Sequence, residues 1–333
     1  MPALKLGFIG VGWIAQRSHL PGLVPLVESG EVVLQAFCDA NEETLREAAA
    51  KYGVERTYAD HHTMLEREAL DALYVLIPPT LHTDAELLAA ERGLALFVEK
   101  PQTLDLAQAR RFEAAIRRSG IVSQVGFMTR YYPAAEAVRE ILADRIPRHA
   151  NIQLFYSGAP LRYWTSRWEL CGGSFVENTI HMVDFLRYLY GDIAQASAFY
   201  LDRKPGEEQG PMNLPHAYVV NYRFAGGVAA NCTTSRCLTD AGVTRREVLL
   251  VSEGSLIEWT PQRILENGRV VWEQEAAGDP FALQARAFVQ AVRAGNPQAV
   301  RSPYAEAFNS LAAVLAANSS ALKGGELTCV EGL

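Results

Sequence analysis

A glycine-containing segment, Gly10 to Ala15, follows an apolar run that starts at Leu4, and Asp39 ends the next apolar run. A strand that turns on glycines into a helix presents free backbone N–H groups to a pyrophosphate, and an acidic residue at the tip of the following strand accepts both ribose hydroxyls. An ordinary βα turn with a solvated Asp39 is the alternative. We expect a dinucleotide site that includes Gly10, Gly12, Trp13, Ile14 and Asp39.

Asp39 also bears on the choice of dinucleotide. A carboxylate at this position repels a 2′-phosphate, and the following Ala40 and Asn41 supply no arginine that could hold one. The sequence therefore favours NAD over NADP.

Two further segments end predicted strands at the ligand-bearing edge of the same sheet. The segment Ile77 to His82 contains two prolines that end a strand and a threonine, Thr80, that can cap the next helix. A capped loop without cofactor contact is the alternative for it. Glu99-Lys100-Pro101 ends the next strand, and its lysine can bond a substrate hydroxyl and the cofactor ribose and stabilise an alkoxide; a surface lysine paired with Glu99 is the alternative. The predicted cofactor contacts here are Ile77, Pro78, His82, Glu99 and Lys100.

A double glycine, Gly172-Gly173, opens a predicted helix that carries Glu177 and His181. Residues four apart share one helix face, and Asp184 continues that stripe. An imidazole is the natural acceptor for a hydroxyl proton near neutral pH, and a neighbouring carboxylate can orient it. A structural helical histidine is the alternative. We predict Lys100, His181 and Glu177 as catalytic residues.

Aromatic and basic residues precede this double glycine, in Arg162-Tyr163-Trp164 and Arg167-Trp168. Aromatic faces stack on the C–H faces of sugar rings, and arginine pairs with carboxylate or phosphate. A purely structural role is an equal alternative. The predicted substrate contacts are Arg130, Tyr163, Trp164, Trp168 and Asn178.

Composition limits the class of protein. A chain of 333 residues with 49% hydrophobic and 21% charged residues can form two soluble domains, and a net charge of −7 without a dense basic run argues against nucleic acid. The five cysteines form no Cys-x-x-Cys pair and no histidine stands at zinc-ligand spacing, so we expect a reduced compartment and no metal. No signal peptide or membrane-length apolar run is present, which favours the cytoplasm and argues against a membrane partner.

The pattern of apolar residues changes near residue 126. Before it, short continuous apolar strands alternate with amphipathic helices, as in a parallel sheet covered on both faces. After it, alternating strands with turn signals such as Asn267-Gly268 predict an antiparallel meander with interspersed helices, an α+β domain. Residues 203–215, rich in Pro, Gly and Glu, predict a mobile loop. The predicted domains are 1–126 for dinucleotide binding and 127–333 for substrate binding and oligomerisation, with the C-terminal helices able to pack back on the first.

Taken in order, these motifs resemble the glucose-fructose oxidoreductase, inositol dehydrogenase and MocA family. The match includes Gly10 to Ala15 with His19, Asp39, Pro78-Pro79 with His82, Glu99-Lys100-Pro101, Gly126-Phe127 with Arg130 to Pro133, Gly172 to His181, and Ala287-Phe288.

This resemblance implies a Rossmann domain followed by a large open, mostly antiparallel sheet. It also implies NAD(P)-linked oxidation or reduction of a sugar, cyclitol or related secondary alcohol, with Lys100 in the Glu-Lys-Pro motif, His181 as base and a cis Lys100-Pro101 bond. Many members have Asp in place of Glu177 and Gly in place of Thr179, so the division of roles between Glu177 and His181 stays open. Glycoside cleavage with transient use of NAD, and a non-catalytic dinucleotide-binding regulator, are the alternatives.

A homodimer or homotetramer is expected. The chain offers few helices to cover both faces of the second sheet, so one broad face, including Ala217 to Thr234, should be buried by another subunit.

Overall fold

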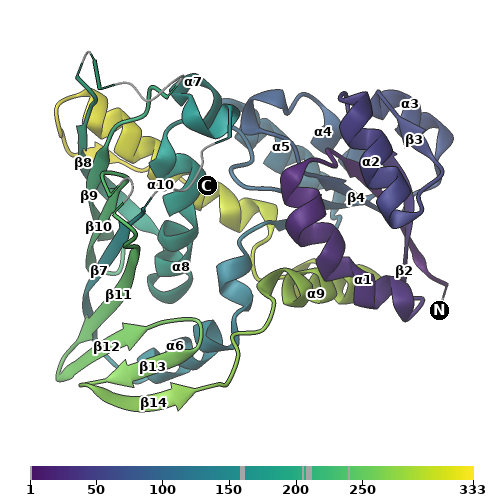
Figure 1. Ribbon diagram of the computed structural model, residues 1–333. Helices are drawn as coiled ribbons and strands as arrows, with labels where there is room; N and C mark the ends of the chain where they lie inside the picture. The colour runs from purple at the N-terminus through teal and green to yellow at the C-terminus, as the bar shows by residue number, and fades with distance from the viewer. Residues whose placement is uncertain (1, 158–161, 205, 208–211, 239–240) are drawn as a thin grey trace. The chain divides into compact units, whose positions relative to one another are not determined.

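The computed structural model describes residues 2–157, 162–204, 206–207, 212–238 and 241–333 (Figure 1). It contains two compact units, Met1–Met128 with Gly278–Glu306 and Thr129–Ala277 with Ala307–Leu333. The first holds a six-stranded parallel sheet and the second a nine-stranded, mostly antiparallel sheet, which confirms the predicted fold class. Part of the expected loop at 203–215 lies outside the described residues.

The first sheet has the strand order β3-β2-β1-β4-β5-β6. Its order reverses between β1 and β4, and ligands bind at such a switch point, beyond the carboxyl ends of the strands. The strands that the sequence predicts over residues 4–9, 32–38, 72–77, 94–98 and 121–125 are all present, with ends that differ by at most two residues; β3 was not predicted. The bounds are β1 Leu4–Ile9, β2 Val32–Cys38, β3 Thr57–Tyr58, β4 Ala72–Val75, β5 Ala95–Val98 and β6 Ser123–Val125.

Helices surround this sheet, and one of them comes from late in the chain (Figure 1). The rings of Phe8 and Tyr74 stack at 4.9 Å and those of Tyr74 and Phe97 at 4.7 Å, while Phe288 of α9 meets Tyr74 edge-on at 5.5 Å. Each such ring contributes roughly 1.5–3 kcal/mol through burial. The helices are α1 Leu20–Glu28, α2 Glu42–Tyr52, α3 His61–Arg67, α4 Ala85–Glu91, α5 Leu106–Ser119 and α9 Pro280–Ala294.

Helix α4 begins later than the sequence indicates. The pattern predicts a helix from Leu81 with Thr80 as its cap, but Thr80 lies inside a short 3-10 turn and Asp84 precedes the first residue of α4. The two prolines fix the backbone of the loop in an extended and then a turning conformation, which delays the helix. Thr80 is therefore not a cap.

The second sheet has the order β14-β13-β12-β11-β7-β10-β9-β8-β15. A single meander is wrong, because β7 lies between β10 and β11 and runs parallel to β10, with Asn151 beside Asn231. Strand alternation reports which face a residue lies on but not which strand is its neighbour. The bounds are β7 Pro147–Phe155, β8 Ile193–Leu201, β9 Ala217–Phe224, β10 Ala229–Ser235, β11 Arg245–Ser252, β12 Ser255–Trp259, β13 Arg263–Glu266, β14 Arg269–Glu273 and β15 Thr328–Cys329.

Helices pack on one face of this sheet, and the other face is more exposed. The Tyr222 hydroxyl of β9 donates to the Ala313 carbonyl of α10 at 3.2 Å, on the helix-covered face. On the opposite face Phe199 is 59% and Val219 40% exposed. The helices of this unit are α6 Pro133–Ala143, α7 Trp168–Cys171, α8 Ile180–Tyr190 and α10 Tyr304–Leu322, the last from residue 307 onward.

Within the described residues, no helix combines the length and apolar character needed to cross a membrane. All five cysteines are free thiols, three of them buried. Burial raises the pKa of the Cys232 thiol to about 12, so this cysteine stays protonated and packs as a small apolar side chain.

A buried ion pair joins the segment before α6 to helix α8. Both Nε and Nη2 of Arg130 donate to Asp184, each at 2.7 Å, and the side chains are only 2% and 0% exposed. The Ser310 hydroxyl of α10 donates to the same carboxylate at 2.7 Å. A buried carboxylate with this many donors organises three segments around one charge.

We expect the Asp184→Ala variant to lower the free energy of unfolding by about 3–5 kcal/mol, because it leaves the Arg130 guanidinium buried and uncompensated. Urea unfolding followed by tryptophan fluorescence measures this. Glu253→Ala, which breaks the exposed pair with Arg148, is the control and should change stability by less than about 1 kcal/mol. Equal effects of the two variants would contradict the interpretation.

Candidate cofactor and catalytic sites

The turn after β1 requires glycine at its first position. Gly10 has a φ of +85°, and a Cβ there would lie 2.7 Å from the Leu76 carbonyl oxygen and 2.8 Å from the Ile77 side chain. Its N–H donates to the Cys38 carbonyl at 2.8 Å. The turn is thus packed against the ends of β2 and β4, at the carboxyl edge of the sheet.

Gly12 has no such reason to be glycine. Its φ is not in the left-handed region, and an added Cβ would meet no protein atom within 4 Å. The space in front of Gly12 is therefore open, as the close approach of a pyrophosphate to the backbone requires. Beside it, Trp13 is 49% exposed and carries the Arg17 guanidinium 5.1 Å from its ring centre.

The Asp39 carboxylate holds this turn in place. Its Oδ2 accepts from the Val11 N–H at 2.9 Å and its Oδ1 from the Asn41 N–H at 2.9 Å. A carboxylate has about four lone-pair sites, so each oxygen keeps capacity for a ribose hydroxyl. The residues present at this edge fit a dinucleotide with a free 2′-hydroxyl.

The loop after β4 is fixed from within the first unit. The His82 ring is buried, with Nδ1 against the Glu86 carboxylate and Nε2 3.3 Å from the Ile77 carbonyl oxygen. Gln108 donates to the His82 carbonyl at 2.9 Å. These contacts make His82 a positioning residue for the loop, and direct contact of Ile77, Pro78 or His82 with the cofactor stays a prediction.

The lysine after β5 is positioned by a buried pair. Glu99 is 7% exposed; its Oε1 lies 2.6 Å from His19 Nε2, and its Oε2 accepts from the Lys100 N–H at 3.0 Å. Both carboxylate oxygens of Glu99 are therefore bonded to groups of the protein itself. The Lys100-Pro101 bond is cis, which confirms the expectation taken from the family resemblance.

The helix that follows the glycine turn and the helix that carries His181 both begin with a π-helical turn. One spans Ala15–His19, before α1, and the other Phe175–Thr179, before α8. Such turns are rare in proteins, and those that occur are often found at functional sites. Glu177 lies in the second turn and His181 follows it in α8, so their relative rotation differs from that of an unbroken α-helix. The expected third member of that stripe, Asp184, is instead buried against Arg130.

The double glycine lies just before the second π turn and packs closely against neighbouring side chains. Gly173 has a φ of +94°, and a Cβ there would lie 2.6 Å from the Trp168 ring. The next residue, Ser174, donates its N–H to the Tyr218 hydroxyl at 3.0 Å. Trp168 thus packs on the glycine backbone, and its role with substrate stays a prediction.

Three residues that were not predicted from the sequence, Tyr156, Arg236 and Arg246, form a cluster beside Asn178. The Tyr156 hydroxyl donates to Asn178 at 2.8 Å, and the guanidinium groups of Arg236 and Arg246 lie 5.1 Å and 5.5 Å from the Tyr156 ring centre. Burial raises the pKa of Tyr156 and Glu177 adds to the shift, while both arginines oppose it.

The signal that could have identified this cluster is the pairing of two strands. Tyr156 and Arg236 follow the parallel strands β7 and β10, whose last residues, Phe155 and Ser235, are partners. Parallel strand ends meet at one edge and commonly carry ligand contacts.

The remaining predicted substrate residues differ in burial and in the segments that carry them. Arg130 is buried with Asp184. Tyr163 is 67% exposed and carries the Arg167 guanidinium 5.0 Å from its ring centre, and Trp164 begins a 3-10 turn. Contact of Arg130, Tyr163 and Trp164 with substrate stays a prediction.

Comparison with known families gives matches in both parts of the chain. Residues 4–127 match the model of an oxidoreductase family with an NAD-binding Rossmann fold, and residues 142–257 match the GFO/IDH/MocA C-terminal domain.

Among curated proteins, the chain is 30% identical over 259 residues to scyllo-inositol 2-dehydrogenase (NAD(+)) of Bacillus subtilis, which covers 76% of this chain and 73% of that protein. It is 33% identical over 204 residues to D-apiose dehydrogenase of Paraburkholderia graminis, covering 58% and 52% respectively. Levoglucosan dehydrogenase, solved with NADH, shares the fold with a TM-score of 0.86 at 19% identity, covering 99% of this chain and 100% of that one.

We expect Asp39→Ala to weaken NAD binding by about 1–3 kcal/mol, because ribose hydroxyls and the turn N–H both lose their charged acceptor. Isothermal titration with NAD and NADP measures it, and the parent should prefer NAD. Asp71→Ala is the matched control, since Asp71 also accepts a backbone N–H, from Lys5 at 2.7 Å, but precedes β4 at the opposite edge. Binding of NADP by the parent as tightly as NAD, or more tightly, would refute the assignment.

Proposed function

Because this chain belongs to the GFO/IDH/MocA oxidoreductase family, we propose that it is an NAD-dependent dehydrogenase whose substrate is a sugar or a cyclitol. The observation that carries the proposal is the open backbone at Gly12 beside the preorganised Asp39 carboxylate. Relatives named for an inositol and for apiose support a polyhydroxylated substrate.

The bound nicotinamide would accept hydride from the carbon that bears the reacting hydroxyl. In that reaction the side chains of this protein would accept the hydroxyl proton and stabilise the negative charge on the oxygen. We assign His181 as the acceptor of the hydroxyl proton and Lys100 as the cation that stabilises the developing alkoxide oxygen. The buried His19 and Glu99 pair holds the backbone of Lys100, and so reduces the reorganisation needed to aim its side chain.

Glu177 and Asn178 have separate roles in this proposal. Asn178 is fixed by the Tyr156 hydroxyl and keeps its amide N–H groups for a substrate oxygen. Glu177 orients His181 and acts electrostatically on Tyr156, whose ring contacts the guanidinium groups of Arg236 and Arg246. A substrate rich in hydroxyls suits a cluster of amide, phenol, guanidinium and carboxylate groups.

We also propose that a second copy of this chain covers the outer face of the large sheet. This face carries the exposed side chains of Phe199, Val219 and Leu256. Between them, Asn231 accepts from Asn151 at 3.4 Å and donates to Asn221 at 2.8 Å, so these amides of neighbouring strands bond one another. Amide groups that are already bonded lower the desolvation cost of burying the face.

If both residues act mainly on the reacting hydroxyl, His181→Asn and Lys100→Met should each lower kcat by about 100-fold or more and change NAD affinity much less, because a positioned acid–base group contributes on that scale. A screen of sugars, inositols and sugar acids by nicotinamide absorbance identifies the substrate for the assay. Lys5→Met, an exposed lysine in β1, is the control.

Glu177→Gln separates the remaining alternatives. A smaller loss with a shifted pH profile is expected if the carboxylate orients His181, whereas a loss equal to that of His181→Asn would make Glu177 the base. Full activity in all three variants would remove the catalytic assignment. Release of free sugar without net NADH would instead indicate glycoside cleavage.

The oligomer is tested by light scattering after gel filtration. We expect the parent to be a dimer or tetramer at micromolar concentration and Val219→Arg to increase the monomer fraction at least about tenfold, because a charge would enter an apolar contact. Val33→Arg is the control, since Val33 is a similarly exposed strand valine of the first unit, 43% against 40%. A monomeric parent would refute the proposal.

A further inference from the structure

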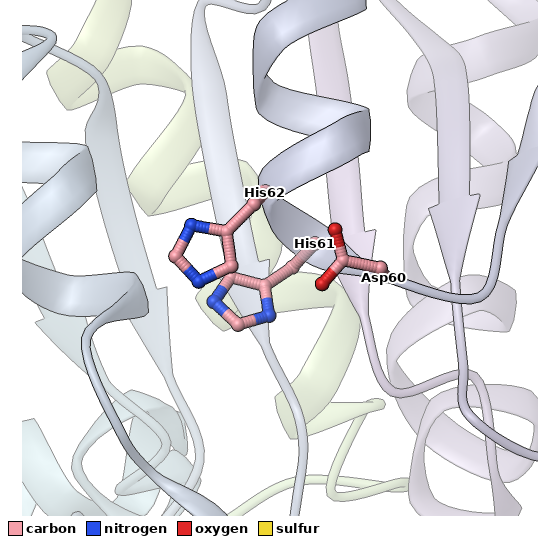
Figure 2. A group of neighbouring side chains, drawn as sticks. All are labelled: Asp60, His61 and His62. Atoms are coloured by element: carbon pink, nitrogen blue, oxygen red, sulfur yellow. The ribbon is translucent and has the colours of Figure 1, made fainter.

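A cluster of histidine and aspartate lies at the start of α3 and includes none of the residues assigned above. Asp60 precedes this helix and accepts from the Thr63 N–H at 2.8 Å, and His61 and His62 form its first two residues. The two imidazole rings lie side by side with centres 4.3 Å apart, next to the Asp60 carboxylate (Figure 2). One ligand atom from each of the three residues lies within 4.8 Å of the other two.

A second carboxylate reaches the same histidines from another loop. Asp84, just before α4, places Oδ1 2.9 Å from His61 Nε2 and Oδ2 3.3 Å from His62 Nε2. The side chains of His61 and His62 are 20% and 51% exposed, so the group is partly shielded but reachable from solvent. The turn before α3 and the loop before α4 thus converge on one pair of imidazoles.

We propose that Asp60, His61, His62 and Asp84 bind one divalent transition-metal ion of the Zn²⁺ class. Imidazole nitrogen with carboxylate oxygen suits Zn²⁺, whereas Mg²⁺ and Ca²⁺ prefer oxygen alone and no thiolate is present in the group to favour Cu(I). Tetrahedral bonds of about 2.0–2.2 Å require donor atoms about 3.3–3.6 Å apart, which small side-chain rotations reach from separations of at most 4.8 Å.

Asp84 has two ways to serve such a site. It can bind the ion directly, or it can accept the second ring N–H of each histidine and so fix both rings for coordination, as carboxylates commonly do around metal-bound histidines. In either case the ion would link the β3–α3 turn to the start of α4. The proposal departs from the expectation of no metal, because adjacent histidines follow no zinc-ligand spacing and Asp84 comes from a separate loop.

The test uses the full chain without a histidine tag, stripped of metal and free of NAD. We expect isothermal titration with Zn²⁺ to give one ion per chain, and Co²⁺ to give the strong visible absorption of a tetrahedral site. His62→Gln should weaken Zn²⁺ binding at least about tenfold, as should Asp60→Asn, which keeps a helix-capping side chain. His149→Gln removes an exposed histidine of the second unit and should leave binding unchanged.

Circular dichroism confirms that the variants are folded, and the side chain of His62 is exposed enough to tolerate the change. Absence of saturable Zn²⁺ binding by the parent would overturn the proposal. Equal Zn²⁺ affinity of the parent, His62→Gln and Asp60→Asn would overturn it too, because binding would then lie elsewhere.

Discussion

The Asp39 carboxylate is the interaction on which the first unit depends. It accepts the Val11 N–H from the glycine turn and the Asn41 N–H that opens α2, so one charged group fixes the end of β1 relative to the end of β2. The same carboxylate is the proposed acceptor for the ribose hydroxyls. Since its orientation is set before any ligand arrives, binding does not have to order it, and the affinity gained from each hydroxyl is correspondingly larger.

The backbone of Lys100 is also held in place by a charged group of the protein. The buried His19 and Glu99 pair is costly to desolvate, and it is retained at a place where it holds the backbone of a predicted catalytic residue. His19 itself ends the π-helical turn that follows the glycine segment. The first helix of the fold therefore takes part in positioning groups at the carboxyl ends of both β1 and β5.

The sequence predicted most of the first unit because its strands are short apolar runs, most of them followed closely by glycine or proline. It missed β3 and α3, of two and seven residues, since neither is long enough to show a period. In the second unit it identified most strands but not their order, because β7 pairs with β10 through contacts distant in sequence. Tyr156 and Arg236 were missed for the same reason: only the pairing of their strands brings Arg236 to the Tyr156 ring, whose hydroxyl bonds Asn178.

Some glycines of the two predicted sites are required by the fold, and another is explained only by a bound ligand. Gly10 is required by its φ and by the Leu76 carbonyl, and Gly173 by its φ and the Trp168 ring, so each would be kept by the protein alone. Gly12 meets neither condition: its φ is not positive, and an added Cβ would contact no protein atom within 4 Å. A glycine pays a conformational entropy cost on folding. Its presence where the protein itself makes no demand points to an atom outside the protein, and a pyrophosphate oxygen at the carboxyl end of β1 is the group that this position would admit.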